Sequence, residues 1–185
     1  MKTTSTIAIA AAGLLTIGLA GCADASGSSG SRVKLYDSVP TLAGDSSIVI
    51  SGTVESQKTA NDIPNGGDFT LSTVEVAATA KSDAAHPAGS SVVVRQHGSQ
   101  KTPGPGALLE TGKTYLLYLT PSGLDGQLAS QFYITGGTAG VYETQQNAGA
   151  RSTGNVTEDT EFTKAPSDEG DTLPTELTLA DALNG

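Results

Sequence analysis

The stretch Thr111-Gly-Lys-Thr-Tyr-Leu-Leu-Tyr-Leu119 carries the clearest structural signal in the chain. Its last five residues are all apolar or aromatic, so the segment has no polar face. A short run of this kind, bounded by turn residues, is typical of a strand buried on both sides. We therefore expect residues 113–120 to form a central β-strand. The segment Ser47–Glu55, SIVISGTVE, is rich in β-branched residues and predicts a second strand.

Turn-forming residues separate these two segments from four further β-type runs. Asn65-Gly66 supplies the positive φ angles that a hairpin turn needs. Between Leu71 and Val74 the apolar positions change phase, which indicates a β-bulge. Short strands at this spacing predict a small barrel or sandwich. The four further strands are predicted over residues 69–80, 91–97, 131–135 and 141–144.

Both flanks of the strand region predict short helices. Residues 33–47 place apolar side chains at near-helical spacing around Pro40, which indicates a short helical lead-in. Near the end, Thr178 and Asp181 have the spacing of a capping box, which predicts a short C-terminal helix. The segment before it is acidic, and residues 167–172 lack the ligand register of a calcium loop. A solvated acidic loop is therefore the favoured interpretation of residues 167–172.

The strand pattern resembles that of OB-type barrels. The phrases at Ser47–Val54 and Thr111–Leu119 are similar to "D-I-V-V-x-G-x-V" and "G-x-x-Y-L-L" of netrin-like domains, which include the tissue inhibitors of metalloproteinases. The resemblance covers residues 46–143 and implies a mainly β fold: a five- to six-stranded OB-like barrel between the two short helices. Netrin-like domains are usually rich in disulfides, whereas this barrel region has no cysteine. The fold transfers from the resemblance, and the inhibitory mechanism does not.

The first 22 residues predict export and lipid attachment. A positive start is followed by the apolar run Ile7–Ala20, which is shorter than the ~20 residues of a membrane span and typical of a secretory signal. The run ends in Leu19-Ala20-Gly21-Cys22, which resembles the lipobox of bacterial lipoproteins. The resemblance implies cleavage between Gly21 and Cys22 and acylation of the Cys22 thiol. The alternatives are a small residue that merely follows a signal helix, or a free reactive thiol.

These features divide the chain into three parts. Residues 1–21 are the predicted lipoprotein signal peptide. Residues 22–32 are a Ser/Gly-rich tether, which lets a folded domain stand off the membrane. Residues 33–185 are the predicted β-barrel domain with its acidic C-terminal segment. The expected location is the cell membrane, with the domain lipid-anchored outside the cytoplasm.

Composition restricts the partners. The net charge of −9 argues against nucleic acid, whose phosphates need clusters of Lys and Arg, and against electrostatic docking on anionic lipid. Membrane attachment is therefore expected through the acyl chains alone. One cysteine excludes a disulfide within a single chain.

None of the candidate motifs for catalysis or metal binding in the sequence is complete. Thr111–Thr114 is similar to the end of a P-loop, but Ala107 occupies the required glycine position and a strand follows. Ser31–Lys34 matches S-x-x-K in a chain too short for the penicillin-interacting fold. Two histidines without a second cysteine predict no zinc site and no Ser-His-Asp triad. We predict no catalytic residues, no metal and no cofactor.

The predicted function is therefore binding. Arg95 and His97 share one face of the strand 91–97, where outward, solvated side chains are expected. They and the adjoining loop Gly98–Gly112, whose prolines limit the entropy lost on docking, form the candidate binding surface. The expected partner is an unidentified protein or glycan of the cell envelope. The alternatives are a small hydrolase acting on cell-wall material and a protease-inhibitor-like protein.

Overall fold

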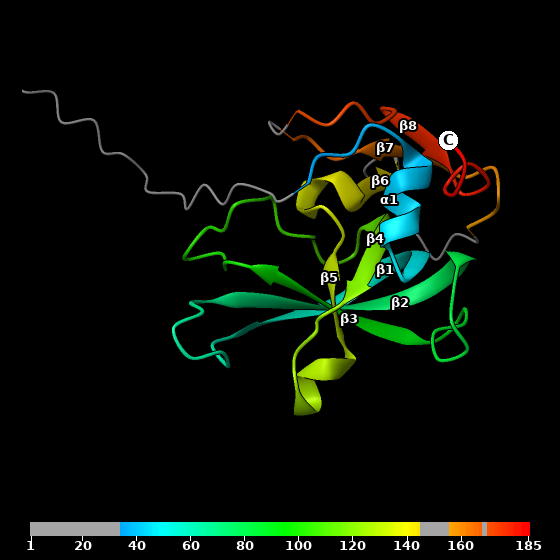
Figure 1. Ribbon diagram of the computed structural model, residues 1–185. Coiled ribbons are helices and arrows are strands. Elements are labelled where there is room, and N and C mark those ends of the chain that lie inside the picture. The colour runs from blue at the N-terminus through cyan, green and yellow to red at the C-terminus, as the bar shows by residue number, and fades with distance from the viewer. Residues whose placement is uncertain (1–33, 145–155, 168–169) are drawn as a thin grey trace, which may run out of the picture.

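The computed structural model describes residues 34–144, 156–167 and 170–185 (Figure 1). The predicted signal peptide, the cleavage site at Gly21 and Cys22, and the tether therefore lie outside the described residues. The described part confirms a mainly β class, with eight strands in one mixed sheet. Among these residues no helix is long and apolar enough to cross a membrane. The elements are α1 (Val39–Asp45), β1 (Ile48–Ala60), β2 (Phe69–Lys81), β3 (Ser91–His97), β4 (Thr114–Pro121), η1 (Gly126–Ser130), β5 (Gln131–Ile134), η2 (Gly137–Gly140), β6 (Val141–Thr144), β7 (Glu161–Lys164) and β8 (Glu176–Thr178).

The strand pairings form a ring with an extension. Strand β1 pairs antiparallel with β2 and, through its first half, with β4. Strand β2 pairs with β3, which pairs in parallel with β5, and β5 returns to β4. Strands β6, β7 and β8 continue outward from β4. In Figure 1 this extension lies beside α1, on the opposite side of the molecule from η1.

The stretch at Thr111–Leu119 forms the strand on which the two cores meet. Strand β4 pairs with β1, β5 and β6, so it is central, as predicted. Tyr115, Leu117 and Leu119 contribute to one apolar cluster, together with side chains of β1, β2 and β3. The alternate residues Leu116 and Tyr118 contribute to a second cluster, which packs against α1 and the C-terminal segment. This alternation explains why the strand is apolar on both faces.

The predicted helical lead-in is confirmed as α1. Pro40 stands in its first turn, where a missing backbone N–H costs no hydrogen bond. Lys81, at the end of β2, donates from Nζ to the carbonyl oxygens of Ala43 and Ser46 at 2.9 and 2.6 Å. A cation at the C-terminal end of a helix offsets its unpaired carbonyls and the negative end of its dipole. The loop leading into β2 places Asn65 at φ 60°, as predicted, but the second positive φ angle is at Gly67 and not at the predicted Gly66.

The sheet has more strands than the five to six predicted, because the acidic C-terminal segment forms β7 and β8 on either side of the predicted loop at residues 167–172. Phe162 of β7 is fully buried and Leu177 of β8 is 4% exposed. Apolar residues in a tail otherwise rich in Asp and Glu thus anchor two short strands, of which β7 pairs with β6 and β8 forms the edge of the sheet. A count of acidic residues misses this, because a three- or four-residue strand needs only one buried side chain.

The predicted C-terminal helix is also wrong, because residues 179–184 form consecutive turns. The Asp181 N–H does donate to Thr178 Oγ1 at 3.2 Å, the bond expected of a capping box. However, Thr178 belongs to β8, where it pairs with Glu161. The turns already bury Ala182 completely, so burial of this residue needs no helix.

Candidate functional site

The candidate site is built on one face of three neighbouring strands. Arg95 and His97 lie two residues apart on β3, and side chains at that spacing share a face. Phe69 of β2 stands opposite His97. Strand β5 runs parallel to β3 in the register that pairs Val93 with Gln131. Tyr133, two residues after Gln131, therefore lies on the same face.

Arg95 is buried, so its predicted exposure is wrong. It is 1% exposed, and its Nη1 and Nη2 atoms donate to the two carboxylate oxygens of Asp62 at 2.8 and 2.7 Å. Its Nε donates to Gln131 Oε1 at 2.6 Å, and its guanidinium lies 4.6 Å from the centre of the Phe69 ring. These partners come from the β1–β2 loop, from β5 and from β2. The burial of Arg95 therefore depends on tertiary contacts that the strand's own sequence does not contain.

His97 is exposed and lies among aromatic rings. Its ring centre is 4.6 Å from that of Phe69, with the planes tilted by 45°. The Tyr133 ring is 6.0 Å away and nearly parallel to it, at 14°. Phe69 is 2% exposed, so it forms a buried base against which the His97 ring packs.

The loop after β3 folds back on the strand through two glycines. Gly98 has φ 93°, and a Cβ added there would lie 2.2 Å from the nitrogen of Gly104. A Cβ at Gly104 would lie 2.0 Å from the carbonyl oxygen of His97. Gln96 holds the next part of the loop by donating to the Ala107 carbonyl oxygen and accepting from the Leu109 N–H. The loop is therefore held against the end of β3.

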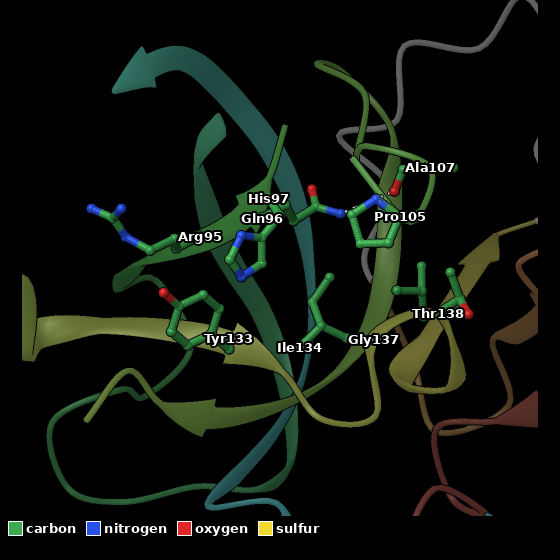
Figure 2. Close-up of a pocket in the computed structure, with 11 residues that line it drawn as sticks. Arg95, Gln96, His97, Pro105, Ala107, Tyr133, Ile134, Gly137 and Thr138 are labelled. Carbon is green, nitrogen blue, oxygen red and sulfur yellow. Dashed lines mark hydrogen bonds between the residues drawn. The ribbon is translucent and has the colours of Figure 1, made fainter. Parts of the chain in front are cut away.

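These elements enclose a hollow of about 240 Å³ between β3, β5 and the loop. Figure 2 shows its side chains spread from Arg95 and Tyr133 at one end, past His97 and Ile134, to Pro105 and Thr138 at the other. A second hollow of about 220 Å³ adjoins it; both are lined by residues 105–107 and Thr138. The two predicted site residues and the predicted loop thus line one cavity.

Several residues of the site were missed by the sequence interpretation. Asp62 lies in the β1–β2 loop, and Gln131 and Tyr133 lie on a strand that was predicted without its neighbours. The alternation within residues 131–134 does indicate that Gln131 and Tyr133 share a face. Only the pairing of β5 with β3 shows that this is the face of Arg95.

The charges of Arg95 and Asp62 neutralise each other at the site. The hydrogen bonds from Arg95 hold the pKa of the Asp62 carboxyl below its ordinary value of 3.8. Burial is the main cause that raises the pKa of the Tyr133 hydroxyl, so this hydroxyl stays protonated at neutral pH. Within the described ranges, no group of three His, Cys, Asp or Glu side chains is placed to hold a metal ion. The hollow presents aromatic rings and the Tyr133 hydroxyl to a ligand, and the partly exposed Asp62 carboxylate lies beyond Arg95, to which it is bonded.

The other histidine lies elsewhere. His86 Nδ1 is 2.7 Å from Asp83 Oδ1, in the loop between β2 and β3. Its ring meets Phe132 edge-on, 5.1 Å away. Phe132 packs in the same apolar cluster as Leu117 and Leu119, on the opposite face of the sheet from His97. His86 is therefore not part of the face that carries His97.

Asp62→Asn is expected to weaken the acid sensitivity of the fold. A carboxyl with a lowered folded-state pKa contributes stability above pH 3.8, and this contribution is lost as the pH falls through the folded value. The variant should therefore melt lower than wild type at pH 7, with a shallower decline in melting temperature below about pH 4. Asp45, Asp68 and Asp83 also have lowered pKa values, so part of the decline should remain. Thermal melts between pH 2 and 7 test this, and parallel curves for the two proteins would contradict it.

Comparison with known proteins gives no relative: no protein-family model and no curated protein matches the chain.

Proposed function

We propose that the chain is a lipid-anchored protein of the cell envelope whose OB-like barrel is a non-catalytic binding module. The observation that carries the proposal is the convergence of Arg95, His97 and the loop after β3 on one hollow. An ordered hollow with aromatic walls and few polar groups is the usual form of a ligand site.

The strand pairings support the OB-like part of this proposal. The order β1–β2–β3–β5–β4, with β4 paired back to β1, is a ring of five strands with one parallel pair. OB-type barrels are five-stranded and bind ligands on a strand face with its adjoining loops. The candidate hollow has that setting.

The lipobox-like sequence Leu19–Cys22 supports the anchoring part. Two or more acyl chains on one residue hold a protein stably on a bilayer, whereas one chain gives marginal attachment. The tether of residues 22–32 can span at most about 40 Å. The anchored domain would therefore meet partners close to the membrane surface.

Cys22→Ser is expected to abolish lipid labelling, because serine lacks the thiol that carries the diacylglyceryl group. Cells fed a radioactive or alkyne-tagged fatty acid should label the wild-type protein and leave the variant unlabelled. The variant should also leave the detergent phase in Triton X-114 partitioning. Identical labelling and partitioning of the two proteins would contradict the anchor.

Photo-crosslinking in intact host cells tests the binding function. A photoreactive amino acid at Thr138, on the rim of the hollow, should give a discrete adduct. The same group at Glu176, exposed on the edge strand β8, serves as the control and should give none. Equal labelling at both sites would place no binding surface at the hollow. Turnover of a cell-wall substrate that is lost in His97→Ala would replace the binding function with an enzyme.

A further inference from the structure

The hollow is walled by a flat aromatic platform. The rings of His97 and Tyr133 lie 14° from parallel, and both reach solvent at least in part. The buried Phe69 ring contacts the His97 ring and itself lies against the Arg95 guanidinium, which supports the position of His97. A ring face carries partial negative charge, so it attracts polarised C–H groups of a flat, saturated ring.

The charge of the hollow favours a ligand that is neutral and donates hydrogen bonds. Arg95 is neutralised by both oxygens of Asp62, so the lining has no spare positive charge for a phosphate or carboxylate. Asp62 is not part of the lining, but it is bonded to Arg95 at one end of the hollow, and its side chain is 34% exposed. The chain's charge of −9 further disfavours an anionic ligand.

A second hollow adjoins the first. Both are lined by Pro105, Gly106, Ala107 and Thr138, and the second extends to Pro166 and Ser167. Each alone is smaller than a typical cavity for a drug-sized ligand. A chain of small units that lies along both fits this shape better than one compact molecule.

We propose that this groove binds a neutral oligosaccharide, with one sugar ring stacked on His97 and Tyr133 and a second unit across Thr138. The inference rests on the proposed function, which places ligand binding at this hollow. Sugar hydroxyls donate to Asp62 and exchange hydrogen bonds with the Tyr133 hydroxyl. A proline-rich peptide also packs on aromatic rings, but its prolines have no N–H to donate to Asp62.

The test uses the purified full-length protein on an array of neutral, amino and acidic glycans, followed by titration of the best neutral hit. Tyr133→Ala should weaken binding about tenfold or more, because it removes half of the platform. Tyr133→Phe keeps the ring and should weaken binding only a few-fold through the lost hydroxyl. His86→Ala, the same residue type as His97 on another face, should bind like wild type, whereas His97→Ala should not. Circular dichroism and melting curves establish that each variant is folded.

Three outcomes would overturn the inference. One is the absence of any array glycan whose binding depends on Tyr133. Another is a preference for acidic over neutral glycans. The third is Tyr133-dependent binding of a proline-rich peptide without glycan binding. If Thr138 still gives an adduct in intact cells in any of these cases, the ligand class is wrong and the proposed function stands. If Thr138 gives no adduct either, both fail.

Discussion

Gly52→Ala is expected to cost about 3 kcal/mol or more of folding stability, at the upper end of what a single methyl group does. Gly52 lies in the middle of β1, between β2 and β4. A Cβ there would lie 2.4 Å from the carbonyl oxygen of Glu75 and 2.7 Å from Val74 Cγ1. The first of these atoms is backbone in a paired strand, so it cannot move without breaking the sheet. Urea unfolding followed by circular dichroism measures the loss.

Gly44→Ala is the matched control. Gly44 lies in α1, and nothing stands within 4 Å of the Cβ that the substitution would add. Alanine is favoured over glycine in a helix by about 1 kcal/mol, so this variant should be as stable as wild type or more so. Equal stability of the two variants would show that the close approach of β1 and β2 at Gly52 is wrong.

Arg95→Ala is expected to cost about 3 kcal/mol, because truncating a large, fully buried side chain leaves a cavity in the packed structure. The substitution leaves Gln131 without its donor, removes the cation over Phe69 and frees Asp62 from the sheet. Urea unfolding at pH 7 measures the loss. Asp62→Ala and the double variant complete a cycle in which the two losses should be strongly non-additive.

Lys113→Ala provides the control for that cycle. Lys113 contacts two carboxylates, Glu110 and Glu143, each at 2.9 Å, but its side chain is 39% exposed. Exposed ion pairs contribute about 0–1 kcal/mol, so this variant should lose little. A loss in Lys113→Ala as large as that in Arg95→Ala would contradict the importance of burial at Arg95.

The strands and the helix were predictable wherever the pattern of apolar residues extends over several positions. The six strands predicted between residues 47 and 144 are all present, and the helical lead-in forms over Val39–Asp45. Strands β7 and β8 were missed because each has only one side chain in the core, Phe162 and Leu177. Periodicity needs several residues to be recognised, and a three- or four-residue strand does not supply them.

The position of the candidate site was predictable from the sequence, but the predicted exposure of Arg95 was wrong. The alternation of a strand was enough to assign Arg95 and His97 to one face. It did not show that Arg95 is covered, because its partners Asp62 and Gln131 lie 33 and 36 residues away along the chain. The rings of Phe69 and Tyr133 on either side of His97 likewise come from the neighbouring strands β2 and β5.

The sequence by itself determined the strands that alternate or are apolar throughout, and the position of the one cysteine behind an apolar run. These features depend on the pattern of side chains along the chain, because that pattern sets which side chains share a face and which are buried. They can therefore be recognised from the sequence alone. Tertiary structure alone decided that the β1–β2 loop brings Asp62 to Arg95 and that β5 lies beside β3. It also decided that the loop after β3 closes on Gly98 and Gly104. Such contacts join segments with no common local signal, because register and loop closure are selected by the packing of the whole domain.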